Sequence, residues 1–193
     1  SLLAYFGDAD DPSVKDAIVA TVGGWVLAVI VGAIPLTSQM IPLNAVFESM
    51  AGFTTTGISL LAEPSNLSHS MLFWRSFTQW IGGLGILTFF IAVIRESGGA
   101  SQRLFSAEAH KTDAGSIRPS LTKSIIDLWR VYGFVTSIII VIYVSLGMTF
   151  FNAINHAFTV LSTGGFSTSA QSMAAFNPAI QLATTLFMFI GGM

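Results

Sequence analysis

The chain has 193 residues, of which 52% are hydrophobic and only 9% are charged, with a net charge of −2. Soluble domains carry roughly 25% charged residues over their surface, so this composition excludes an ordinary soluble enzyme. The absence of cysteine excludes disulfides, thiolate nucleophiles and Cys-ligated metals, and no basic cluster is present to bind nucleic acid. These properties predict an all-α polytopic membrane protein.

The first half of the chain contains two long apolar runs and one short one. Residues 1–16 form a polar, acidic lead-in, and the uncharged run 17–36 is predicted to cross the membrane as a helix that ends at Pro35. The apolar stretch 43–53 would make a helix of only ~16 Å, which can enter a membrane but cannot cross it. Residues 70–94 are predicted to cross again.

The middle of the chain has a different character. Residues 95–130 hold ten of the eighteen charges, including six of the eight basic ones. Segment 95–122 is therefore predicted to be a solvent-exposed linker, and its Lys/Arg excess places it in the cytoplasm. After it, 131–150 is the third predicted span, 152–161 is again short, and 178–193 is a fourth apolar stretch.

These boundaries predict four segments: a cytoplasmic lead-in (1–16), a first membrane unit (17–94), the linker (95–122) and a second membrane unit (123–193). The final apolar stretch would span about 24 Å as a helix, which is less than a hydrocarbon core of ~30 Å. Because the chain also begins with Ser1 rather than Met, we expect it to be a piece of a longer protein.

The two membrane units repeat each other. An ungapped shift of 108 residues aligns 44–59 with 152–167, and five of the sixteen aligned positions are identical. The same shift pairs Gly83 with Gly191. Each unit therefore has the pattern of a membrane helix, a re-entrant half-helix, a polar turn with glycine and a second membrane helix.

The polar turn after each half-helix predicts an ion path. Non-helical backbone at membrane depth is tolerated where it is buried in protein or lines a water-filled path. The carbonyl oxygens of such a turn can replace the hydration shell of a cation, and glycine permits the backbone geometry that points them one way. The C-terminus of a half-helix adds partial negative charge, so the pattern favours cations over anions.

The sequence resembles the Trk/Ktr/HKT superfamily of potassium transporters, especially its bacterial TrkH-type subunits. The matching stretches are FESMAGFTTTGIS, FWRSFTQWIGGLGILTFFIAV, RLFSAE, SIRPSLTKSIIDLW and HAFTVLSTGGFST, in this order. The resemblance covers nearly the whole chain from about Asp16 onward. It implies tandem helix–pore-loop–helix repeats, four of them around a pseudo-fourfold cation pore, of which this chain supplies the first and most of the second.

The resemblance also assigns a filter that coordinates K+ as the transported ion, with no tightly bound cofactor. Its residues are Thr55, Thr56, Gly57 and Ile58 in the first unit and Thr163, Gly164, Gly165 and Phe166 in the second. In plant members a serine at the first-unit glycine accompanies sodium preference, so Gly57 favours potassium. A sodium-conducting relative of the same fold remains the alternative.

The resemblance implies partners as well. Bacterial members work as homodimers in the cell membrane, surrounded by lipid, with a ring of cytoplasmic nucleotide-binding regulatory subunits on the side of the linker 95–122. The chain itself has no Gly-rich phosphate loop on a βαβ unit, so any nucleotide would bind the partner.

Three polar side chains near the turns have simpler interpretations. Glu48 is predicted to hydrogen-bond neighbouring backbone rather than to touch the cation. Arg75 either lines an outer vestibule or extends to the membrane interface as an anchor. His156, placed beside the position equivalent to Glu48, is predicted to be a packed side chain rather than a pH sensor. The glycines of QWIGGLG are expected to allow close helix packing.

Two other classes of function compete with a cation pore. The polar turns would be ordinary connections in a structural membrane subunit that conducts nothing. An intramembrane hydrolase would use Ser167 with His156, but no Gly-x-Ser-x-Gly elbow is present and no third group orients the base. The chain is therefore predicted not to be an enzyme.

Overall fold

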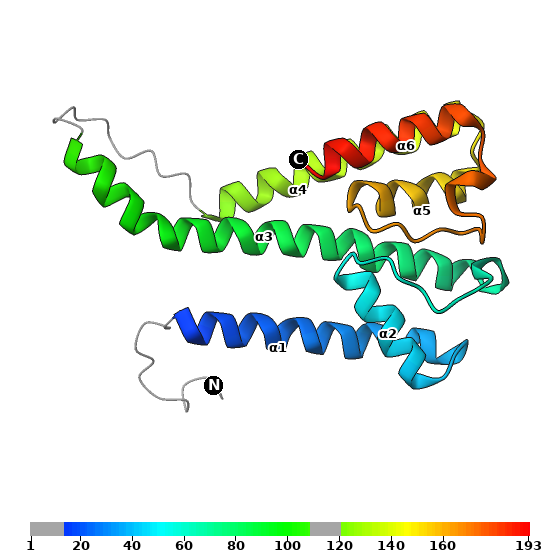
Figure 1. Cartoon of the computed structure of the whole chain (residues 1–193), viewed down its shortest axis with the longest axis horizontal. Helices are drawn as coiled ribbons and strands as arrows, with labels where there is room; N and C mark the ends of the chain where they lie inside the picture. The colour runs from blue at the N-terminus through cyan, green and yellow to red at the C-terminus, as the bar shows by residue number, and fades with distance from the viewer. Residues whose placement is uncertain (1–13, 109–120) are drawn as a thin grey trace.

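The computed structural model describes residues 14–108 and 121–193, and within these ranges the regular structure is helical, without a strand. Its α-helices are α1 (Val14–Ala33), α2 (Pro42–Phe53), α3 (His69–Glu108), α4 (Leu121–Ser145), α5 (Phe150–Leu161) and α6 (Pro178–Gly191), as Figure 1 shows. This confirms the all-α prediction. Most of the predicted lead-in 1–16 and part of the predicted linker, 109–120, lie outside the described residues.

Two sets of three helices follow the same order along the chain. The short helices α2 and α5 each have 12 residues, and they begin and end at positions related by the predicted shift of 108. Both follow an extended residue, Ile41 or Thr149, with φ of −62° in each case. A helix of 12 residues is about 18 Å long and cannot cross a bilayer, which agrees with the expected half-helices.

The shift changes by one residue after the polar turns. A 3₁₀ turn of three residues, Pro64–Asn66, has a counterpart of four, Ser172–Ala175. From there on, equivalent positions are 109 apart, so the predicted pairing of Gly83 with Gly191 is wrong and Gly82 is the counterpart of Gly191. A Cβ on Gly82 or on Gly191 would overlap the backbone carbonyl of the last residue of the short helix in its own unit.

Two helices differ in extent from the spans predicted for them. Helix α3 contains the predicted span 70–94 and continues to Glu108, because extending a helix is easier than starting one. Helix α4 does not match the predicted span 131–150. Its charged first turns, from Leu121 on, are also helical, and the helix ends at Ser145, just before Gly147 with φ +96°. Thr149 then starts α5 as an N-cap.

In the first unit, α2 packs between α1 and α3. Ser49 Oγ donates a hydrogen bond to the Val29 carbonyl over 2.8 Å, which joins α2 to α1. The indole N–H of Trp74 on α3 donates to the Gly32 carbonyl, also over 2.8 Å. These bonds between distant residues join α2 and α3 to α1.

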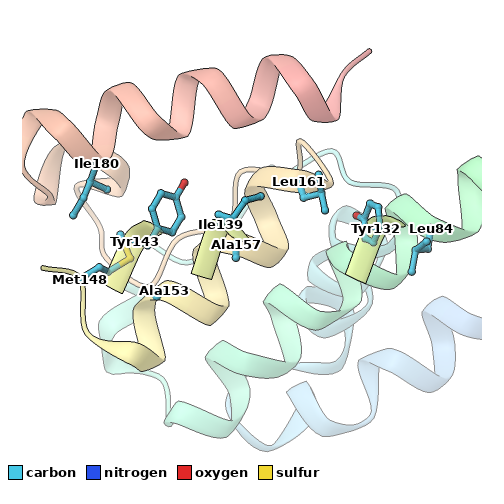
Figure 2. Packing of buried hydrophobic residues seen from close by; sticks show 9 residues of the cluster. All are labelled: Leu84, Tyr132, Ile139, Tyr143, Met148, Ala153, Ala157, Leu161 and Ile180. Carbon is cyan, nitrogen blue, oxygen red and sulfur yellow. The ribbon is translucent and has the colours of Figure 1, made fainter. Parts of the chain in front are cut away.

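In the second unit, α5 lies between α3 and the pair formed by α4 and α6 (Figure 1). Ala153 and Ala157 on α5 are fully buried, and their small size lets larger side chains of α4 approach, among them Ile139 and Tyr143. Figure 2 shows these residues in the buried cluster. The Tyr143 hydroxyl also lies 2.7 Å from Thr184 Oγ1 on α6. The packing holds α5 firmly behind the turn that follows it.

The outward faces of the long helices are apolar. Among the described residues, two helical stretches are long and apolar enough to cross a membrane, Thr21–Ser38 and Lys123–Ser145, and α6 is apolar but shorter. Leu27 on α1 and Phe134 on α4 are 63% and 68% exposed. Apolar surface of this extent needs an apolar environment or further protein to cover it.

Candidate functional site

The helix α2 ends in a specific backbone turn. Thr55 has a left-handed conformation with φ +54°, and its N–H donates to the Gly52 carbonyl over 2.9 Å. The N–H of Thr56 donates to the Ala51 carbonyl over 3.1 Å. This pair of bonds is the Schellman motif, in which glycine is the usual left-handed residue.

The same turn ends α5. Thr163 has φ +55°, and its N–H donates to the Val160 carbonyl over 3.0 Å. The N–H of Gly164 donates to the Thr159 carbonyl over 2.8 Å. Every partner in this turn is displaced by 108 residues from its counterpart in the first unit, so the two turns have the same geometry.

A threonine in the left-handed region is costly because its branched Cβ crowds the backbone. The described residues contain three non-glycine residues with positive φ, and two of them are Thr55 and Thr163, at equivalent positions. Strain of this kind persists where the surrounding structure enforces it and is found mainly at functional sites. Sequence patterns gave no sign of it, because threonine does not normally mark a left-handed residue.

A second left-handed residue follows two positions later in each turn. Gly57 has φ +73° and Gly165 has φ +83°. Glycine is favoured at both positions because a Cβ makes this conformation costly. The eight predicted filter residues therefore form two short non-helical segments, 55–58 and 163–166, with the same alternation of left-handed residues; they are called strands below, although they are not β-strands.

The two strands meet at one point. A Cβ on Gly57 would overlap the backbone carbonyl oxygen of Gly164, whereas a Cβ on Gly165 would have no described atom within 4 Å. Two hollows of about 150 Å³ each border the strands, one touching Gly57 and Gly165 and the other touching Thr55 and Thr163. The structure thus brings both predicted filter segments to the same place, with open space beside them.

Behind the first strand lies a buried ion pair. Glu48 on α2 is 1% exposed, and its carboxylate accepts hydrogen bonds from Ser59 Oγ (2.7 Å) and the Leu60 N–H (3.2 Å). It also accepts one from Arg75 Nε on α3 over 2.9 Å. The prediction that Glu48 bonds backbone is confirmed in its bond to the Leu60 N–H, whereas its side-chain partners Ser59 and Arg75 were not predicted.

Of the two predicted positions of Arg75, the anchor at the membrane interface is wrong, whereas the residue does line the hollow beside Gly57 and Gly165. Its side chain is 2% exposed and is held by Glu48, 27 residues earlier in the chain, because a buried guanidinium needs a partner for its charge. Arg75 also donates to Ser59 Oγ over 3.1 Å, and its guanidinium carbon lies 4.1 Å from the centre of the Phe166 ring. One arginine therefore contacts the second strand and the residue that follows the first strand.

The second unit has an uncharged arrangement at the same place. His156 occupies the position equivalent to Glu48, not the one beside it as predicted, because the shift of 108 relates the two residues directly. It is 1% exposed, and its Nε2 lies 3.3 Å from Thr168 Oγ1, which is 3.0 Å from Asn152 Oδ1. The prediction of a packed histidine is confirmed.

The pairing that a hydrolase would need is not formed. Ser167 Oγ accepts a hydrogen bond from the Ser169 N–H over 3.1 Å, and the imidazole of His156 faces Thr168 instead. Among the described residues, no group activates Ser167 as a nucleophile.

One further side chain at the site was missed by the sequence analysis. Gln79 on α3 is 0% exposed, and its Oε1 accepts a hydrogen bond from the Phe166 N–H over 3.1 Å. The two residues are 87 positions apart, and no local pattern indicates such a contact.

Known proteins with similar sequences match nearly the whole chain. The family described as "TrkH: Cation transport protein" matches residues 3–193. An uncharacterized cation transporter of Methanocaldococcus jannaschii is 36% identical, over 91% of this chain and 37% of its own length. The Trk system potassium uptake protein TrkH of Escherichia coli K12 is 32% identical, over 92% of this chain and 38% of its own length.

A solved structure has the same arrangement of helices. The crystal structure of the potassium transporter TrkH from Vibrio parahaemolyticus superposes with a TM-score of 0.78 and 28% identity, over 97% of this chain and 39% of that one. The chain thus spans less than two fifths of the length of these relatives. The extent of the family match identifies the chain as a member of the TrkH family of cation transport proteins.

Proposed function

We propose that this chain forms two of four walls of a potassium-conducting pore, in which backbone carbonyls of residues 55–58 and 163–166 coordinate K+. The observation that supports this most is the repeated pair of left-handed residues, a strained threonine and a glycine, at the C-terminus of each half-helix. Coordination by carbonyl oxygens replaces the hydration shell of the ion.

The backbone geometry suggests how such a filter works. A strand with left-handed residues at alternate positions can direct its carbonyls to one side, which an extended strand cannot do. The C-termini of α2 and α5 point their partial negative charge toward the same strands and favour a cation there. Several weak sites in succession allow K+ to leave as readily as it enters.

The remainder of the proposal concerns the whole protein. Two further units would close the pore, and units 17–94 and 123–193 would be related by the pseudo-fourfold axis. A homodimer in the cell membrane would present the linker 95–122 to a cytoplasmic nucleotide-binding regulatory subunit. The relatives named as Trk potassium uptake proteins support K+ as the ion.

Growth of cells that lack their own potassium uptake systems tests the proposal. Expression of the complete gene should restore growth on limiting potassium and produce rapid Rb+ uptake, because Rb+ resembles K+ in size and hydration. Radioactive Na+ uptake in the same cells serves as the control for selectivity.

The alternatives predict other results in that experiment. A sodium-conducting relative would take up Na+ and leave growth on limiting potassium unrestored. A structural subunit would take up neither ion despite good expression in the membrane. Either result would contradict the proposed potassium filter.

A further inference from the structure

Gln79 connects the two filter strands across the boundary between the units. It belongs to α3 of the first unit, yet its Oε1 accepts the N–H of Phe166 in the second strand. Its Nε2 lies 3.7 Å from the place that a Cβ on Gly57 would take in the first strand. A single buried amide therefore lies against both strands.

The orientation of this amide is determined by its partner. The Phe166 N–H is a donor, so only Oε1 can face it, and Nε2 must face the other way. Nε2 has no hydrogen-bond partner among the described residues. A buried amide with an unsatisfied donor destabilises a fold, so stability alone does not explain a glutamine at this position.

Gln79 also explains the difference between the two filter sequences. The second strand has Gly164 where the first has Thr56, yet Gly164 is not among the glycines with positive φ. A Cβ on Gly164 would lie 2.6 Å from Gln79 Nε2. Glycine is needed here for space rather than for conformation, because the glutamine fills the room that a side chain would take.

The bond from Gln79 fixes the direction of a filter carbonyl. In a planar trans peptide the N–H of one residue and the carbonyl of the preceding residue point in opposite directions. Holding the Phe166 N–H toward Gln79 thus directs the Gly165 carbonyl away from α3. The space beside Gly165 is open as well, since a Cβ built on this residue would have no described atom within 4 Å.

We infer that Gln79 is a positioning residue for ion selectivity, because its bond to Phe166 sets the direction of the Gly165 carbonyl. This inference rests on the proposed potassium filter. The residue at the equivalent place on α6 is Met188, which is 41% exposed and has no amide. The link is thus a feature of the junction between the first and second units.

Substitutions in the complete protein, reconstituted in liposomes, test this inference. Gln79→Leu removes the acceptor at similar size, and Gln79→Glu keeps an acceptor at the same reach. Ser76→Ala is the matched control, since Ser76 is buried on the same helix and donates only to the Leu72 carbonyl. The readouts are the ratio of Rb+ to Na+ uptake and the melting temperature.

Loss of one buried hydrogen bond should lower the Rb+/Na+ ratio of Gln79→Leu about fivefold or more. Gln79→Glu should recover most of this ratio, and Ser76→Ala should keep it. If the leucine variant does not fold, the shorter Gln79→Asn, which cannot reach Phe166, should show the same loss. Folded leucine or asparagine variants with an unchanged ratio would overturn the inference and leave the proposed function standing. An unsubstituted protein without Rb+ uptake would contradict both.

Discussion

Replacement of Gly57 by alanine in the complete protein is expected to reduce Rb+ uptake more than about 30-fold. A left-handed conformation costs an L-residue with a Cβ about 1–2 kcal/mol, which corresponds to a factor of 5–30. At Gly57 the added Cβ also overlaps the backbone carbonyl of Gly164, which belongs to the proposed filter and cannot move without distorting the second strand.

Gly165 provides the comparison for this result. Its φ is similar, at +83°, but a Cβ there meets no described atom within 4 Å. Gly165→Ala should therefore show the conformational cost alone, with uptake reduced about 5- to 30-fold. Gly24→Ala, at an exposed position of α1 without close neighbours, should leave Rb+ uptake unchanged. An effect at Gly165 equal to or larger than that at Gly57 would show that contact between the strands is not the cause.

The second large effect is expected from the buried ion pair. Arg75→Leu leaves the Glu48 carboxylate buried without its compensating charge, and breaking a buried pair in this way costs about 3–5 kcal/mol. The melting temperature of the complete protein in detergent should fall strongly. The double variant Glu48→Gln with Arg75→Leu should recover most of this loss, because a neutral amide can accept the Leu60 N–H through its oxygen and donate to Ser59 Oγ through its NH2 group.

Arg130 supplies the matched control for the ion pair. It bonds Asp127 over 3.1 Å, but both side chains are well exposed, at 75% and 67%. Surface pairs of this kind contribute less than about 1 kcal/mol, so Arg130→Leu should leave the melting temperature nearly unchanged. Equal losses for Arg75→Leu and the double variant would mean that lost packing, rather than an unpaired charge, destabilises the protein.

Local sequence patterns predicted the half-helices and the glycines of the turns. The apolar stretch before each turn is too short to cross a membrane, and its end at Phe53 or Leu161 coincides with the change to polar residues. Gly57 and Gly165 could be predicted as turn residues because they occupy equivalent positions after equivalent helices, and both adopt a left-handed conformation that favours glycine. Such features depend on residues that are close together in the chain.

Contacts between distant residues were not predictable in the same way. Arg75 carries a charge that predicts exposure or a partner, but nothing in the sequence selects Glu48, 27 residues away. Gln79 lies in an apolar helix and shows its role only through Phe166 and Gly164 of the other unit. The sequence likewise did not reveal that the shift grows by one residue within the 3₁₀ turns, so Gly83 was paired with Gly191 in place of Gly82.

The location of bound Rb+ in crystals of the complete protein tests the potassium filter most directly. Anomalous scattering from Rb+ should give peaks on the path beside residues 55–58 and 163–166, within coordination distance of the Gly57 and Gly165 carbonyl oxygens. The peaks should weaken when Na+ replaces Rb+. Rb+ bound elsewhere along the pore, with these carbonyls unoccupied in a protein that still transports Rb+, would contradict the assignment of the filter.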